Sequence, residues 1–82
     1  MHSAIVAWQY YNISMIKENK IGKKIKKLRR AKGLSQDRLS KLADVSYNSI
    51  IKLEREEITN PTIKTLQKIA KALEVQVDDL IS

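Results

Sequence analysis

From residue 21 onward, apolar residues recur with the spacing of amphipathic helices. Ile21, Ile25 and Leu28 lie at i, i+4 and i+7, which predicts a helix from Ile21 to Lys32 with one apolar face. Gly33 comes next and is typical of a helix end, because glycine readily adopts the left-handed conformation. The first predicted helix of the chain therefore has about three turns.

Two shorter helices are predicted next, over residues 35–43 and 46–55. Ser35 and Ser46 are good N-caps, because a serine hydroxyl can accept a hydrogen bond from a free N–H of the first turn. A break at residues 44–45 separates the two helices. We expect the inward residues to be Leu39, Leu42 and Ala43 on the first helix and Ile50 and Leu53 on the second.

The remainder of the chain predicts a loop, a fourth helix and a final short turn. Residues 56–61 are mostly polar and include the one proline, so they form the loop. Thr62 caps the fourth helix, and the last turn runs from Asp78 to Ile81. The inward residues of the fourth helix are Ile63, Leu66, Ile69, Ala70 and Leu73. These helices predict an all-α domain over residues 17–82.

The N-terminal leader, residues 1–16, differs from the rest of the chain. It has no formal charge and contains the only tryptophan and two of the three tyrosines. Met15 directly precedes the basic helical pattern and could be the true start, which would make the leader an artefact or a disordered tail. The alternative is a segment that pairs with an apolar patch on a partner subunit. The sequence leaves both interpretations open.

The composition narrows the chemistry. The chain has no cysteine, which excludes disulfides, thiolate metal sites and a cysteine nucleophile. Its one histidine, His2, cannot form a histidine metal site alone. We find neither a nucleophile with a base nor a glycine-rich phosphate loop, so we expect no enzymatic activity, no metal and no cofactor.

Positive charge is concentrated in one stretch. Residues 17–41 contain eleven basic and two acidic side chains, whereas residues 42–82 contain five basic and seven acidic ones. A basic segment on a small domain attracts polyanions such as nucleic acid, although the lysines of such a helix can also serve only to keep the protein soluble. No apolar run approaches the roughly 20 residues that span a bilayer, and residues 1–16 carry no Lys or Arg to open a secretory signal. We therefore expect a cytoplasmic protein without a membrane partner.

The two short helices carry the candidate binding chemistry. Helices joined by so few residues cross steeply, as in a helix-turn-helix, and the second one projects from the body. Asparagine can bind adenine through two hydrogen bonds, lysine can donate to guanine, and an aliphatic group can contact the thymine methyl. The side chains placed to contact bases are Tyr47, Asn48, Ile51 and Lys52.

Residues 21–81 resemble the phage Cro and repressor helix-turn-helix family, also called XRE-like. The resemblance rests on a long spaced pattern that includes Arg29, Gly33-Leu34-Ser35-Gln36, Leu39, Leu42-Ala43, Val45-Ser46, Ile50, Leu53-Glu54, Asn60-Pro61, Leu66, Ile69-Ala70, Leu73, Val75 and Leu80. It implies a five-helix lambda-repressor-like fold. It also implies that Tyr47, Asn48 and Lys52 occupy base-contacting positions.

The resemblance assigns further roles beside those positions. Gln36 would contact the DNA backbone and brace the recognition helix, and Ser46 would cap that helix beside a phosphate. Arg29 and Glu54 match a structural ion pair between helices. We also expect backbone contacts from Lys24, Arg55 and Asn60.

Some positions depart from the family pattern. Asp44 replaces the usual glycine of the turn, and Glu74 stands where a helix-ending glycine is common. The loop over residues 55–60 is long, lacks glycine and carries two acidic residues, which weakens its expected grip on DNA. Ile51 is apolar where a polar residue is more usual, so it could contact a methyl group, a dimer mate or the leader.

Two functions from different classes follow. The first is a sequence-specific regulator, such as a repressor or controller, that binds double-stranded DNA as a homodimer on an inverted repeat. The second is a protein-interaction module, such as an antitoxin, that binds DNA only together with its toxin or another partner.

Overall fold

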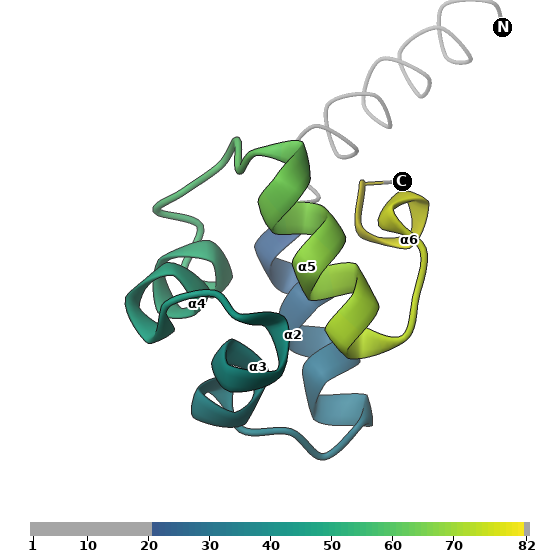
Figure 1. Ribbon diagram of the computed structural model, residues 1–82. Helices are drawn as coiled ribbons and strands as arrows, with labels where there is room; N and C mark the ends of the chain where they lie inside the picture. Colours follow the sequence, from purple (N-terminus) through teal and green to yellow (C-terminus); the bar gives the residue numbers. More distant parts are fainter. Residues whose placement is uncertain (1–20, 82) are drawn as a thin grey trace, which may run out of the picture.

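Five α-helices form the part of the chain that the structure, a computed structural model, describes: residues 21–81 (Figure 1). They are α2 (Ile21–Ala31), α3 (Gln36–Ala43), α4 (Tyr47–Glu54), α5 (Ile63–Leu73) and α6 (Val77–Ile81). The predicted all-α, five-helix fold is thus confirmed. The leader, residues 1–16, lies outside the described residues, and so do its two interpretations.

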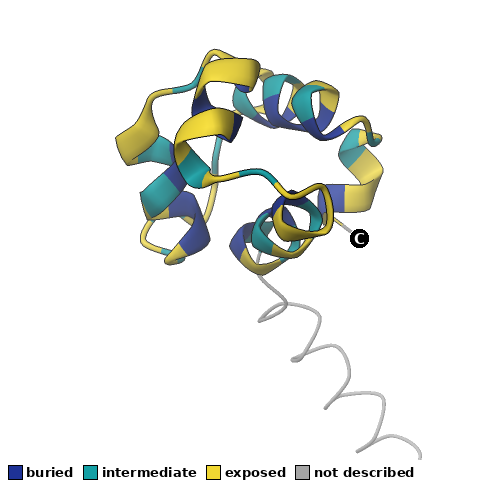
Figure 2. Ribbon diagram, turned by 90° about the horizontal axis from the view of Figure 1, so that it is seen from below, coloured by how far each residue is buried: buried dark blue, intermediate teal, exposed yellow. Residues whose placement is uncertain are grey.

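The helices enclose one core of aliphatic side chains. In Figure 1, α5 crosses in front of α2, with α4 on one side of the pair and α6 on the other. Buried stretches of the helices face this interior and exposed stretches face outward (Figure 2). The largest side chains with at most 1% of their surface exposed are Ile25, Leu39, Ile50, Leu53, Ile69, Leu73 and Leu80. Burial of such a side chain stabilises a fold by about 1.5–3 kcal/mol.

Two residues that the pattern placed inward are exposed, and for these the prediction was wrong. Leu42 is 49% exposed, because α3 packs mainly against α4 and α5 and buries a narrow row of Leu39, Ser40 and Ala43. The hydroxyl of Ser40 donates to a carbonyl of its own helix, which allows its burial. Ile63 is 61% exposed, because it is the first residue of α5 and the buried row starts one turn later, at Leu66.

Four successive helices end in the same way, with one residue in the left-handed conformation. These residues are Gly33, Asp44, Glu56 and Glu74, with φ between 55° and 69°. In each case the next N–H donates to a carbonyl five residues earlier: Leu34 to Arg29, Val45 to Ser40, Glu57 to Lys52 and Val75 to Ala70, at 2.8–3.0 Å. This is the Schellman arrangement, which satisfies carbonyls that a helix end leaves free.

Ion pairs tie the helix ends together. Lys32, just after α2, pairs with Glu74, just after α5. The hydrogen bond from Lys32 and its positive charge hold the pKa of Glu74 below its ordinary value. Lys68 of α5 lies 3.8 Å from the Asp44 carboxylate in the turn between α3 and α4. Both pairs are on the surface, so each contributes little to stability.

Candidate nucleic-acid interface

The turn between α3 and α4 sets the direction in which α4 leaves the body. The Ser35 hydroxyl caps α3 by accepting from the N–H of Arg38 at 3.0 Å, and the Ser46 hydroxyl caps α4 by accepting from Ser49 at 3.1 Å. Between them, Asp44 adopts φ 55° and ψ 46°. Aspartate tolerates this left-handed conformation better than most residues, so the turn forms without glycine.

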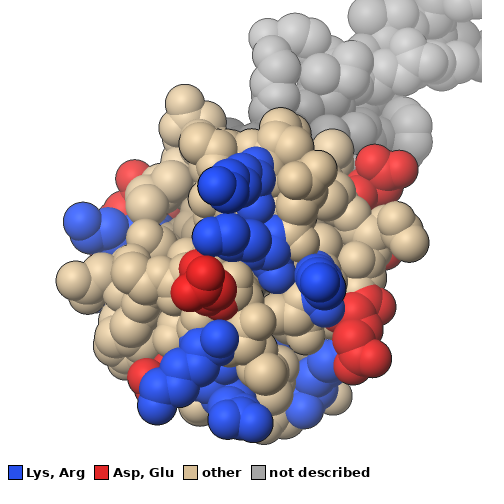
Figure 3. Space-filling model, in the orientation of Figure 1, with Lys and Arg blue, Asp and Glu red and all other residues tan. Residues whose placement is uncertain are grey.

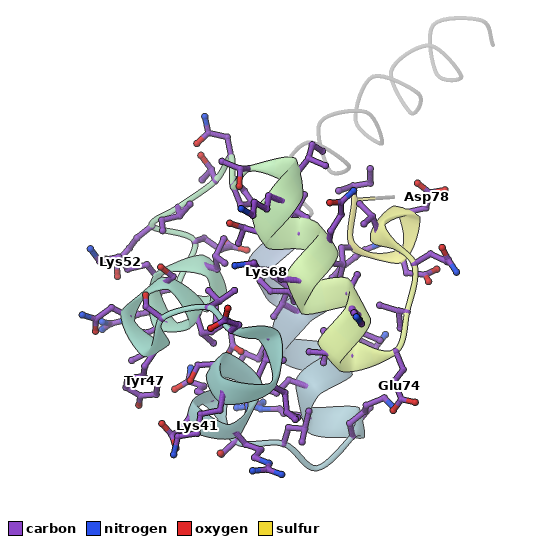
Figure 4. The ribbon with its side chains drawn as sticks, in the orientation of Figure 1. Lys41, Tyr47, Lys52, Lys68, Glu74 and Asp78 are labelled. Carbon is purple, nitrogen blue, oxygen red and sulfur yellow. The ribbon has the colours of Figure 1, made fainter. Side chains whose placement is uncertain are left out.

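Helix α4 has one buried side and one free side. Ile50 and Leu53 are at most 1% exposed and anchor the helix in the core. Tyr47 and Lys52 point away from the body, toward open solvent (Figure 4). Asn48 is also exposed, whereas Ile51 is only partly accessible. Of the four side chains expected to contact bases, three are therefore free to reach a ligand and Ile51 lies at the edge of that surface.

The inner end of α4 is fixed by a buried ion pair. The Nε and Nη2 atoms of Arg29 donate to the two carboxylate oxygens of Glu54 at 2.6 and 2.9 Å. The Nη1 atom of Arg29 donates to the Leu34 carbonyl at 2.7 Å, so one guanidinium joins α2, the turn before α3, and α4. The hydrogen bonds to Glu54 raise the pKa of Arg29 and outweigh the opposing effect of burial. Arg29 therefore stays charged at every accessible pH.

Gln36 joins the same network. Its Nε2 atom donates to the Glu54 carboxylate at 3.1 Å, from a half-buried position at the start of α3. One amide proton is thus committed to Glu54, which holds the side chain against α4. The bracing contact expected of Gln36 is present in this geometry.

A close approach between α2 and α4 was not anticipated from the sequence. Gly22 is buried, and a Cβ atom built on it would lie 1.9 Å from the carbonyl oxygen of Leu53. Only glycine lets the two backbones come this close. A glycine two residues into a predicted helix, where it costs up to about 1 kcal/mol, was the available signal.

The residues expected to contact the DNA backbone do not form one group. Gln36 is the first residue of α3, and Ser46 directly precedes α4. Arg55 and Asn60 are exposed in the loop after α4, where Arg55 lies 3.6 Å from the Glu57 carboxylate. Lys24 lies apart from these residues, in a groove between α2 and α6 that Val75 and Asp79 also line.

The charges near α4 are balanced. Residues 36–54 contain three basic and three acidic side chains. The face seen in Figure 3, over α3, α4 and α5, shows basic and acidic groups interspersed. In the loop, Glu56 has one buried carboxylate oxygen without a hydrogen-bond partner. This surface offers hydrogen-bonding groups rather than net positive charge.

Neither a candidate metal cluster nor a membrane-spanning helix occurs within the described stretch. Within residues 21–81, no group of three or more His, Asp or Glu side chains lies close enough to hold a metal ion. None of the helices in this stretch combines the length and hydropathy that crossing a bilayer requires.

Comparison with known families identifies the arrangement. The helix-turn-helix family model HTH_3 matches residues 25–80. Over 62 residues, the chain is 37% identical to the HTH-type transcriptional regulator SinR of Bacillus licheniformis, covering 76% of this chain and 56% of that protein. It is also 33% identical over 61 residues to the immunity repressor protein of Bacillus phage phi105, covering 74% of this chain and 42% of that one. The chain spans about half the length of the curated relatives it matches.

Solved structures agree with the sequence comparison. The crystal structure of SinR, the master regulator for biofilm formation, in complex with DNA has a TM-score of 0.74 and 37% identity, and covers 76% of this chain and 98% of that one. The restriction-modification controller protein C.AhdI from Aeromonas hydrophila has a TM-score of 0.70 and 29% identity, covering 83% and 97%. Both the resemblance and the fold predicted from the sequence are confirmed by these matches.

Proposed function

Since this chain belongs to the helix-turn-helix family whose model matches residues 25–80, we propose that it is a non-enzymatic transcriptional regulator that binds double-stranded DNA. Helix α4 enters the major groove, where Asn48 and Lys52 read base edges and Tyr47 contacts the adjoining bases or backbone. Gln36 and Ser46 contact phosphates on either side of it. Two copies of the chain bind the two halves of an inverted repeat, whose centres are about 34–36 Å apart.

One observation carries this proposal: α4 is anchored on one side and bare on the other. Ile50 and Leu53 fix the helix in the core, while Asn48 and Lys52 stay exposed. The bidentate contact of Arg29 with Glu54 holds its orientation. A rigid helix with free hydrogen-bonding groups matches the dimensions and chemistry of the major groove. The relatives that are named as regulators, and the one solved with DNA, support the same conclusion.

The test compares Asn48→Ala with Lys24→Ala. The preferred site is first selected from a random pool of duplexes, and binding is then measured on that site and on unrelated duplex. We expect Asn48→Ala to weaken the preferred site by about 1–3 kcal/mol while changing unrelated duplex little, because a base contact carries the sequence information. We expect Lys24→Ala to weaken both duplexes by the same factor.

The outcomes separate the parts of the proposal. Equal losses on the two duplexes for Asn48→Ala would remove Asn48 from base reading. A wild-type protein that selects no sequence from the pool would overturn the regulator function itself. The spacing of the selected half-sites reports whether two copies bind together.

A further inference from the structure

The net positive charge of the described residues lies on a single helix, α2, and not on α4. Helix α2 contains six basic residues and no acidic one. Residues 32–81 contain eight basic and eight acidic residues, so their charges cancel. Within residues 21–81, the long-range attraction for a polyanion therefore originates on α2.

Four of the α2 cations form one surface, which we call the α2 stripe: Lys23, Lys26, Lys27 and Arg30. They line a common shallow depression on a flank of the helix that is separate from its buried residues, which are Gly22, Ile25 and Arg29; Lys26, at the edge of this flank, is only partly exposed. Their spacing of three, four and seven residues keeps them on one face over a length of about 10 Å. None of the four pairs with a carboxylate of residues 21–81.

The α2 stripe gathers four like charges on one helix, all unpaired within the described residues. Lys32, Lys41 and Lys68 each lie within ion-pair distance of an acidic side chain. Unpaired like charges at i and i+4 destabilise a helix. The stripe contains two such pairs, Lys23 with Lys27 and Lys26 with Arg30, so it works against the stability of α2.

We propose that the α2 stripe is a second nucleic-acid contact that binds the phosphate backbone of duplex DNA independently of sequence. This rests on the proposed function only for the choice of duplex DNA as partner. In this division, α4 supplies discrimination with no net charge, and the α2 stripe supplies electrostatic affinity. A row of flexible ammonium and guanidinium groups that form no ion pair within residues 21–81 suits phosphates, which follow each other regularly along a strand.

The test uses two double variants of equal charge. Lys23→Gln with Lys27→Gln removes two cations of the stripe, and Lys64→Gln with Lys71→Gln removes two exposed cations of α5 that pair with no acidic residue of the described chain. Binding to a duplex of random sequence and to the selected site is measured over a series of salt concentrations. Circular dichroism confirms that each variant is folded.

We expect the stripe variant to reduce the slope of log affinity against log salt by about 1.8, the value for two lost phosphate contacts. Its affinity for the random and the selected duplex should fall by the same factor. The α5 variant, with the same net charge, should keep the wild-type slope.

Equal effects of the two double variants, with sequence selection intact, would overturn the stripe while leaving the proposed function standing. A stripe-dependent slope in a protein that selects no sequence would do the reverse. Binding of the wild type to polyglutamate but to no duplex would assign the stripe to an acidic protein partner and overturn the inference.

Discussion

At the scale of single residues, Glu54 connects three helices. Its two oxygens accept from the guanidinium of Arg29 and the amide of Gln36, so three helices meet at one carboxylate. Its side chain is 2% exposed, which means that its charge depends on Arg29 for compensation. A buried charge that loses its partner is far more costly than a surface one.

Replacing Arg29 with alanine should therefore destabilise the domain without altering its sequence preference. We expect a loss of about 3–5 kcal/mol in the free energy of unfolding, because Glu54 would be left buried and unpaired. Chemical denaturation measures this loss. Lys41→Ala, which removes an exposed pair with Asp37, is the control and should change stability by less than about 1 kcal/mol. Melting temperatures equal to wild type for Arg29→Ala would contradict the structural role.

At the scale of elements, the four left-handed helix ends explain where sequence reasoning succeeded and where it stopped. The left-handed conformation is predictable at Gly33, because glycine adopts positive φ readily, and at Asp44, because aspartate tolerates it. Glu56 and Glu74 carry no such signal, since glutamate has no preference for this conformation. Their φ values of 63° and 59° are imposed by the packing of the helices on each side. Each costs roughly 1–2 kcal/mol relative to a relaxed backbone.

The same limit applied to burial and to the interface. Periodicity identified the residues of α4 that face the core, because its buried pair, Ile50 and Leu53, repeats at i and i+3. It misplaced Leu42, because one sequence does not say which neighbours a short helix will have. It also missed the contact of Gly22 with α4, which depends on how α2 and α4 cross and joins two residues 31 positions apart in the sequence.

Glycine at position 56 should stabilise the domain. Glu56→Gly relieves the left-handed backbone and removes a carboxylate oxygen that is buried without a partner, so we expect a gain of about 1 kcal/mol. The neighbouring Glu57→Gly is the matched control, because Glu57 is exposed and its φ is not positive. Thermal denaturation should rank Glu56→Gly above wild type and Glu57→Gly at or below it. The opposite ranking would show that the Glu56 side chain contributes more than its backbone costs.

At the scale of the whole molecule, the positive charges concentrated on α2 favour binding to DNA and lower the stability of the fold. Helix α2 has no acidic residue in its first turn, where a negative charge would stabilise the helix by interacting with its dipole. It has instead a row of like charges that repel one another. The core formed by residues such as Ile25, Ile69 and Leu73 holds this helix in place despite the repulsion.

Lys23→Glu should therefore raise stability and weaken binding together. The new carboxylate would lie in the first turn of α2 and four residues before Lys27, the favourable orientation for a helix ion pair. We expect a melting temperature above those of wild type and of the neutral control Lys23→Gln, with weaker binding to random duplex. A melting temperature no higher than that of the control would refute the repulsion within α2.

The outward cations of α2 occupy a contiguous stretch of eight residues, Lys23 to Arg30, in which Ile25 and Arg29 turn inward and Leu28 is partly buried. A stretch this short can be transferred to another helix of the same family. Grafting its four solvent-facing positions onto the first helix of a related but neutral domain leaves the recipient's interior unchanged. Such a chimera would take its sequence-independent affinity for duplex DNA from this protein and its preferred binding site from the recipient.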